Sequence, residues 1–189
     1  TKKIVLILYR LLLMNISSYI GNNEIKITEK EILSFLKIIK RWPLNYPSGQ
    51  SSVEIINNYN NTTNTFFNSD GFLNYIEWYK YYNKGYTTIL SNVLDLNDQL
   101  RKINIDLKYK IGNEVNGNLY FSKSKQLASF KPHSHPYPVV VKQIYGQCNW
   151  KINNKNITVN PQDTIYIPAE TIHGVESSKG KRLSLTINL

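Results

Sequence analysis

Hydrophobic positions repeat at a helical spacing in the first half of the chain. Residues 28–42, TEKEILSFLKIIKRW, begin with Thr28 and Glu31, a capping box that satisfies free backbone donors at a helix start. Apolar side chains then fall on one helical face, and Pro43 ends the pattern. These side chains are Ile32, Phe35, Leu36 and Ile39. The pattern therefore predicts a helix over this stretch.

Two more helices and a strand are predicted before residue 113. Residues 71–85 and residues 96–112 have helical spacing, the first with Asp70 as its cap. Between them, YTTILSNV at residues 86–93 is rich in β-branched side chains, which favours a strand. Residues 45–69 are polar and rich in asparagine, so we expect a long loop there.

From Glu114 onward the pattern changes to short apolar runs separated by Asn, Gly and Pro. The runs are GNLYFS, YPVVVKQIY, CNWKI, ITV, DTIYIP and LSLTINL. Many short strands at regular spacing predict a mainly β architecture, either a barrel or a jelly roll. The chain of 189 residues is long enough for one domain with a real core and too short for two comfortable ones.

The first fifteen residues, TKKIVLILYRLLLMN, combine a basic start with an apolar run, as in a signal peptide. However, Arg10 interrupts the run, and no small-residue cleavage site follows it. The run is also too short to span a bilayer. We expect a buried strand or helix, or a stretch ahead of the true start, with a weak targeting signal as the alternative.

The composition indicates in which cellular compartment the protein is expected and which classes of partner are expected. A single cysteine, Cys148, excludes a disulfide framework, so we expect a cytoplasmic protein without a membrane partner. The formal net charge is +10, from 23 Lys and Arg against 13 Asp and Glu. A basic surface can favour nucleic acid. Here the lysines are scattered and form no stripe or block, so we do not expect nucleic acid to be the partner.

The chain has three histidines, and their placement suggests a metal site. His133 and His135 alternate in HSHPYPVVV, so on a strand they would share one face. His173 follows YIPAETI, where the turn after Pro168 would bring a later strand back beside the first. Three ligands would leave coordination positions open, as a catalytic metal requires. The alternative is that these histidines make core hydrogen bonds or lie on the surface.

The order of elements over residues 83–189 resembles the cupin superfamily, and most closely its JmjC-type (Jumonji-like) oxygenase branch. The block of His133, Gln143, Gly146 and Trp150 is similar to the H-x-D … Q-x-x-G-x-x-x-W pattern of that branch. The resemblance implies a double-stranded β-helix (cupin or jelly roll) over residues 83–189. The helical spacing before it predicts an N-terminal helical region over residues 1–82, packed on the barrel as part of a single integrated domain.

The resemblance also implies an active site. Fe(II) would be held by His133, His135 and His173, which would be the catalytic residues. In the resembled enzymes the iron binds 2-oxoglutarate and O2, and the oxidant that results hydroxylates or demethylates a substrate. Relatives often dimerise, so a homodimer is also an expectation.

Two positions depart from that pattern. The second ligand of the family is usually Asp or Glu, whereas here it is His135. Three-histidine iron is usual in other cupin dioxygenases, which use no 2-oxoglutarate. The lysine that pairs with 2-oxoglutarate in many JmjC relatives is replaced by Cys148. A dicarboxylate in a dry barrel needs a charged partner, and four basic residues could replace the lysine. They are Lys131, Lys142, Lys151 and Arg182, although strand parity points Lys142 away from the histidines.

Further site residues follow from the same resemblance. Asn188 matches an asparagine near the metal and cosubstrate, and Tyr120 sits where an aromatic side chain often lines the pocket. Either Cys148 takes part in cofactor binding, as a ligand or nucleophile, or it is a small buried hydrophobe. Glu170 could support His173 or act as a base, or it could be solvated. The expected substrate pocket is formed by Val139, Val141, Gln143 and Trp150.

The leading hypothesis is therefore a mononuclear non-haem Fe(II) oxygenase acting on a small molecule or peptide with O2. Within it, 2-oxoglutarate-dependent hydroxylation follows from the nearest resemblance, and cosubstrate-free dioxygenation or oxidative rearrangement follows from the three histidines. The alternatives are a non-redox cupin isomerase or lyase that uses Zn, Ni or Mn, and a non-catalytic binding module.

Overall fold

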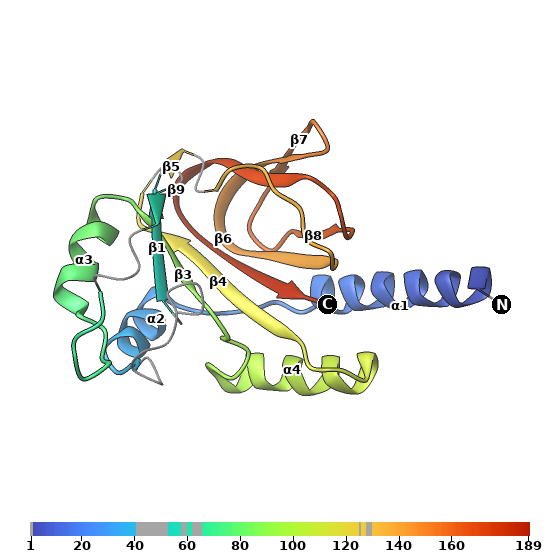
Figure 1. The fold of residues 1–189 in the computed structure, drawn as a ribbon, viewed down its shortest axis with the longest axis horizontal. Coiled ribbons are helices and arrows are strands. Elements are labelled where there is room, and N and C mark those ends of the chain that lie inside the picture. Colours follow the sequence, from blue (N-terminus) through green and yellow to red (C-terminus); the bar gives the residue numbers. More distant parts are fainter. Residues whose placement is uncertain (1, 41–52, 58–59, 62–65, 125, 128–129) are drawn as a thin grey trace.

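The structure is a computed structural model that describes residues 2–40, 53–57, 60–61, 66–124, 126–127 and 130–189. Within these ranges four helices precede or flank a predominantly antiparallel sheet (Figure 1). The helices are α1 (Lys2–Asn22), α2 (Glu29–Leu36), α3 (Tyr75–Asn83) and α4 (Asp98–Ile111). The strands are β1 (Val53–Asn57), β2 (Asn60–Asn61), β3 (Thr87–Leu90), β4 (Asn116–Ser122), β5 (Gln126–Leu127), β6 (Val139–Ile152), β7 (Lys155–Val159), β8 (Thr164–Ile167) and β9 (His173–Asn188).

Helix α2 begins at the capping box that the sequence predicts. The Glu31 backbone N–H donates to Thr28 Oγ1 at 3.2 Å, and the Thr28 N–H donates to Glu31 Oε2 at 2.7 Å. Both Ile32 and Leu36 are buried. The helix ends at Leu36, short of the predicted end at residue 42, and the expected stop at Trp42-Pro43 lies outside the described residues.

The other helices follow the predicted ranges with one change of cap. Asn74, not Asp70, caps α3, because its side chain accepts from the Glu77 N–H at 3.1 Å. Asp70 instead accepts from the Phe72 N–H at 3.0 Å and shapes the turn before the helix. Helix α4 ends at Gly112, whose φ of 77° is the left-handed conformation that glycine adopts most easily.

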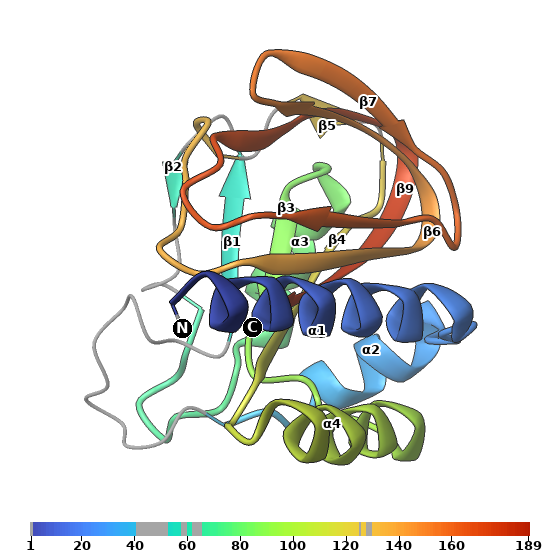
Figure 2. The same ribbon diagram turned by 90° about the vertical axis from the view of Figure 1, so that its right-hand side faces the viewer.

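Residues 2–22 form α1, one of the structures expected for the N-terminal apolar run. From Leu11 onward its described side chains place Leu13, Ile16 and Ile20 in the core, and the helix runs along β8 and β6 (Figure 2). Lys142 on β6 donates from Nζ to Gly21 O at 3.0 Å and to Gln162 O at 2.8 Å. None of the described helices has the length and hydropathy needed to cross a membrane.

The strands form one antiparallel sheet in the order β2-β1-β3-β4-β9-β6-β7, with β5 on β9 and β8 on β6. Strands β1 and β2 lie within residues 45–69, where the sequence predicts only a loop. The pairs that join β1 to β3 run from Val53–Leu90 to Ile56–Thr87. Strand β1 lies before residue 82, the expected end of the N-terminal helical region, and it pairs with β3, which lies after that residue. The sheet therefore extends across the expected boundary between the two regions.

Strands β6 and β9 form a long ribbon that bends on itself and gives the barrel its shape (Figure 2). Their pairing runs from Val139–Asn188 at one end to Ile152–His173 at the other, with register shifts between Gln143 and Gln147. At the bend, Gly146 has a φ of 74°, and a Cβ there would lie 2.1 Å from Lys181 O. Only glycine allows this close approach without displacing the backbone.

Residues 133–138, named the closing segment here, connect the two ends of this ribbon. At its start, His133 forms an isolated bridge with His173. At its end, Pro138 O accepts a hydrogen bond from the Leu189 N–H at 3.0 Å. The fold is thus mainly antiparallel β with helices toward the N-terminus, and the predicted mainly β barrel architecture is confirmed.

Candidate metal centre

The three histidines come from the closing segment and from the first residue of β9. Backbone hydrogen bonds run both ways between His133 and His173, at 3.0 Å and 2.9 Å. His133 and His135 do not lie together on a strand, so the strand predicted for them is wrong. His133 lies in an isolated bridge and His135 lies outside the strands, because β6 begins only at Val139. The rings of His133 and His135 nevertheless lie close to each other and to the ring of His173.

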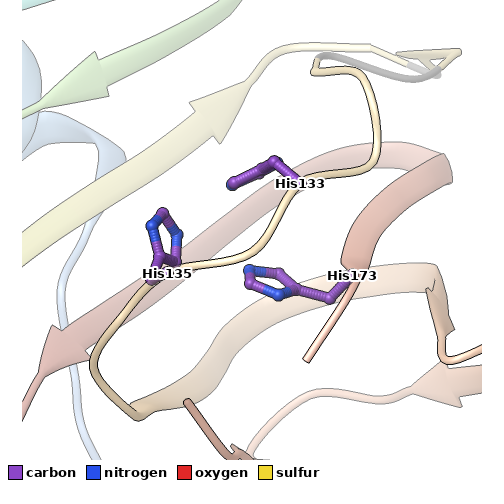
Figure 3. A group of neighbouring side chains, drawn as sticks. All are labelled: His133, His135 and His173. Carbon is purple, nitrogen blue, oxygen red and sulfur yellow. The ribbon is translucent and has the colours of Figure 1, made fainter. Parts of the chain in front are cut away.

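The three imidazole rings converge on one point (Figure 3). The centroid of the His133 ring lies 4.8 Å from each of the other two, which are 5.2 Å apart. One nitrogen from each ring lies within 4.8 Å of the others. His173 is buried, and His135 is half-buried. The structure therefore brings together the three residues that the sequence nominated as ligands.

Backbone carbonyls fix the orientation of two of the rings. His133 Nδ1 lies 2.9 Å from Lys131 O, and His173 Nδ1 lies 2.7 Å from Thr171 O. A carbonyl oxygen only accepts, so Nδ1 of each ring is the donor, and in a neutral ring Nε2 is then the nitrogen with the free lone pair. Such a bond is the usual support for a metal-binding histidine. The ring of His135 is held instead by stacking on Tyr137, with centroids 5.0 Å apart and planes 8° apart.

The surroundings favour neutral imidazole. Burial lowers the pKa of His135, and the neighbouring rings of His133 and His173 lower it further. Burial also lowers the pKa of His173, although the hydrogen bond to Thr171 opposes this. Neutral imidazole is the form that binds a metal ion. His173 thus combines a lowered pKa with a hydrogen bond that fixes its donor nitrogen.

The arrangement fits a transition-metal ion. Metal–imidazole bonds of about 2.0–2.1 Å place ligand nitrogens about 3 Å apart, so small side-chain rotations would bring the three nitrogens into range. Imidazole is a ligand for Fe, Cu, Ni and Zn alike. The three rings would occupy one side of the ion and leave the remaining positions open toward the cavity. This is the geometry of a site that can bind a reactant.

The rings face a cavity of about 600 Å³ inside the barrel. Its walls are mostly apolar, and none of the described residues that line it is an aspartate or a glutamate. Apart from the three histidines, the lining residues are Ile56, Tyr120, Phe130, Lys131, Val139, Val141, Trp150, Gly174, Val175, Arg182, Ser184 and Thr186. The volume is in the range of small-molecule sites.

Four of the expected pocket and cofactor residues line this cavity. These are Tyr120, Val139, Val141 and Trp150. Burial raises the pKa of Tyr120 to about 12, so its hydroxyl stays protonated at neutral pH. Trp150 stacks near His173, with ring centroids 6.3 Å apart.

Three other expected residues do not line the cavity, each for a local reason. Gln143 is fully buried behind Ser184, whose Oγ donates to Gln143 Oε1 at 2.7 Å. Cys148 is also fully buried, and Arg182 Nη1 contacts its Sγ at 3.7 Å, so the arginine covers it. Asn188 is the last residue of β9 and lies beyond the lining residues of that strand.

Of the four basic residues that could pair with a carboxylate of 2-oxoglutarate, two line the cavity and two do not. Arg182 and Lys131 line the cavity. Lys142 points away from it to the end of α1, as strand parity predicts. Lys151 lies 3.9 Å from Glu176 and does not line the cavity. Glu170 is exposed, and only its backbone N–H supports the site, through a 2.7 Å bond to His135 O.

Several lining residues were not predicted from the sequence. Ser184 and Thr186 alternate with Arg182 along β9, so strand parity could have placed all three on one face. Ile56 had no such signal, because β1 lies in a stretch predicted as loop. Phe130 precedes the H-x-H pair and contacts His133 edge-on at 5.8 Å between ring centroids.

Comparisons with known proteins bear on the fold. Residues 117–187, less than half of the chain, match the model of the family described as AraC-like ligand binding domain. No protein in the curated set matches the chain. The solved structures that match include a cupin superfamily protein from Desulfitobacterium hafniense DCB-2, with 20% identity, a TM-score of 0.36, and coverage of 40% of this chain and 66% of that one.

Two further matches are of the same kind. An RmlC-like cupin from Shewanella frigidimarina NCIMB 400 is 11% identical, with a TM-score of 0.36 over 39% of this chain and 64% of that one. KdgF from Halomonas sp. is 14% identical, with a TM-score of 0.35 over 39% of this chain and 67% of that one. The matched region thus spans about two thirds of each of these chains. The family match and the antiparallel barrel support the cupin superfamily, and they do not confirm the JmjC-like oxygenase branch.

Proposed function

We propose that this chain is a metal-dependent enzyme, and specifically a mononuclear non-haem Fe(II) oxygenase that acts on a small molecule or peptide. The convergence of His133, His135 and His173 on one point at the wall of an apolar cavity supports this proposal most strongly. Fe(II), when bound, would supply O2 activation at its open coordination positions.

The protein's own residues would prepare that chemistry. The carbonyls of Lys131 and Thr171 hold the Nδ1 protons, so that the Nε2 atoms of His133 and His173 stay free for the metal. Val139, Val141 and Trp150 form an apolar wall that limits water around the substrate. Tyr120 keeps its proton and can donate a hydrogen bond to a substrate oxygen.

Two forms of the oxygenase remain to be separated by experiment. Three neutral ligands, without the usual carboxylate, favour oxygenation without 2-oxoglutarate. Arg182 in the cavity favours 2-oxoglutarate, since it could pair with a carboxylate in place of the family lysine. Titration of 2-oxoglutarate into Fe(II)-loaded protein under air tests this, with O2 uptake and succinate as the readouts. Stimulated uptake with succinate supports the dependent form, and its absence removes that form.

The central experiment measures metal content after anaerobic reconstitution with Fe(II). We expect about one ion per chain in the natural sequence and less than about one tenth of an ion in His135→Ala, because two ligands hold the ion too weakly. Ser134→Ala is the matched control, since Ser134 lies between the two histidines, is exposed and does not line the cavity. Equal iron content in all three proteins would overturn the proposal.

The second candidate is a non-redox role for the same site. Imidazole ligands alone do not select iron over Zn or Ni, so an isomerase or lyase fits the same three residues. The matched family model describes a ligand binding domain, and a binding module without catalysis would use the same cavity. Substrate conversion without O2 would identify the isomerase or lyase. Ligand binding to protein that takes up no metal would identify the module.

A further inference from the structure

Arg182 is a buried cation in the wall of the cavity. It is 2% exposed, and its guanidinium donates from Nη2 to Thr87 Oγ1 at 3.3 Å and from Nη1 to Cys148 Sγ at 3.7 Å. Both contacts help to fix the orientation of the planar group. A buried guanidinium loses much of its hydration, so a partner that satisfies it inside the protein contributes more than it would on the surface.

The polar part of the cavity is concentrated around this residue. Ser184 and Thr186 lie on the same face of β9, and Tyr120 on β4 pairs with Ser184 in the sheet register. Most of the remaining wall is apolar, formed by Ile56, Phe130, Val139, Val141, Trp150 and Val175. The cavity therefore has a cationic, hydrogen-bonding region on β9 and β4 and an apolar remainder.

The charge in and near the cavity favours an anion. None of the described lining residues carries a carboxylate, and the three histidines are neutral ligands, so a bound divalent ion would keep its full positive charge. Lys131 adds a further cation to the wall. Among the described residues, Glu54 places a negative charge near the cavity, since it acts electrostatically on Tyr120 and shares a face of β1 with the lining residue Ile56. Its removal should strengthen the preference for an anion.

We propose that the site takes an organic monocarboxylate with an apolar body, with the carboxylate on Arg182 and the body along the apolar wall that leads to the histidines. This rests on the proposed function for the metal, but the carboxylate contact is independent of it. An apolar body is favoured because apolar side chains dominate the rest of the wall. A guanidinium is well suited to grip a carboxylate with two parallel hydrogen bonds.

The test is calorimetric binding of phenylacetate and of its neutral isostere phenylacetamide to the Zn(II)-loaded chain, since Zn(II) prevents turnover. We expect phenylacetate to bind at least roughly tenfold more tightly than the amide, and Arg182→Met to abolish that preference. Arg182→Lys should retain part of it, because the charge remains but the fork geometry is lost. Glu54→Gln should tighten phenylacetate binding and leave phenylacetamide binding unchanged.

Lys151→Met is the matched control, since it removes a positive charge from β6 outside the cavity and should change neither affinity. If Arg182→Met does not fold, Arg182→Lys and Glu54→Gln still carry the test. Equal binding of the two probes, or an unchanged preference in Arg182→Lys and Glu54→Gln, would overturn the proposal. The proposal would also be overturned if substitution of Arg182 weakened the binding of 2-oxoglutarate but left the binding of phenylacetate unchanged. Metal content, measured in parallel, reports separately on the proposed function.

Discussion

His133 and His173 hold their rings in the same way, each through a hydrogen bond from Nδ1 to the carbonyl two residues earlier. The two residues also exchange backbone hydrogen bonds with each other. The ring orientations are therefore set by backbone geometry and do not depend on a carboxylate. The H-x-H spacing was enough to nominate the ligands, but the reason given for it, strand alternation, does not apply to this closing segment.

At the residue scale, Gly146 and Gly180 offer a matched pair. Both have positive φ, 74° and 78°, but a Cβ at position 146 would lie 2.1 Å from Lys181 O, whereas nothing lies within 4 Å at position 180. Gly180→Ala should cost about 1–2 kcal/mol of unfolding free energy from backbone strain alone. Gly146→Ala should cost about 1–3 kcal/mol more, because the bend must open. Urea unfolding measures both, and equal costs would contradict this account of the bend.

At the element scale, the helices were predicted better than the strands. Capping residues and helical spacing are local signals, and they located α3, α4 and the start of α2 within a few residues, although α2 ends six residues before its predicted end. Strand β1 was missed because its five residues, VEIIN, lie in an asparagine-rich stretch and are stabilised by pairing with β3 far along the chain. The bends in β6 and β9 likewise depend on pairing, which a single strand sequence does not specify.

Lys142 links α1 to the barrel through hydrogen bonds. This residue is 1% exposed, and its Nζ donates to Gly21 O in the last turn of α1 and to Gln162 O. Lys142→Met keeps the aliphatic stem but leaves two carbonyls without these donors, so we expect a loss of about 1–3 kcal/mol in unfolding free energy. The control is Lys155→Met, at an exposed position on β7, which should change it by less than about 0.5 kcal/mol. Similar losses in both variants would argue against this role.

Helix α2 is tied to α3 and to β9 through Glu29. Its carboxylate accepts from Tyr82 Oη at 2.5 Å and forms an ion pair with Lys181. Burial acts to raise the pKa of Glu29, but the hydrogen bonds from Lys181 and Tyr82 outweigh it and hold the pKa below the ordinary value of 4.5. A lowered pKa in the folded state means that the ionised form stabilises the fold at pH values above 4.5.

This stabilisation should be lost as the pH falls through the lowered pKa, and Glu29→Gln removes it at every pH. The difference in melting temperature between the natural chain and Glu29→Gln should therefore be largest near neutral pH and shrink below pH 4.5. Thermal unfolding at a series of pH values measures this difference. Glu114→Gln, which changes an exposed ion pair with Lys108, is the control and should show little effect. A difference that does not shrink in acid would count against this role of Glu29.

At the scale of the whole molecule, the cavity is built by segments that are far apart in the sequence. Its wall combines residues from β1, β4, the closing segment, β6 and β9. The sequence predicted the fold class, the three histidines and four of the other lining residues, because each has a local or motif signal. It did not predict which basic side chains line the cavity. Arg182 and Lys131 line it and Lys151 does not, and this difference depends on the tertiary structure around each residue.

Metal binding should stabilise the whole fold, because the three ligands join the closing segment to β9. At a free metal concentration of 100 times the dissociation constant, the expected gain is about 2.7 kcal/mol. For a chain of this length, that corresponds to a rise of roughly 5–10 °C in melting temperature. Differential scanning fluorimetry with added Fe(II) or Zn(II) measures the rise. His135→Ala should show little of it, and an equal rise in that variant would place the metal elsewhere.

The closing segment also has a consequence for the order of events during folding. Two of the histidines precede β6, whereas the third begins the strand that must pair with β4, β5 and β6 before the barrel exists. A chain emerging from the ribosome has none of these long-range pairs until β9 has been made, so it presents only two of the three rings together. Uptake of the ion therefore reports that the last strand is in place, and incompletely folded chains should be left without it.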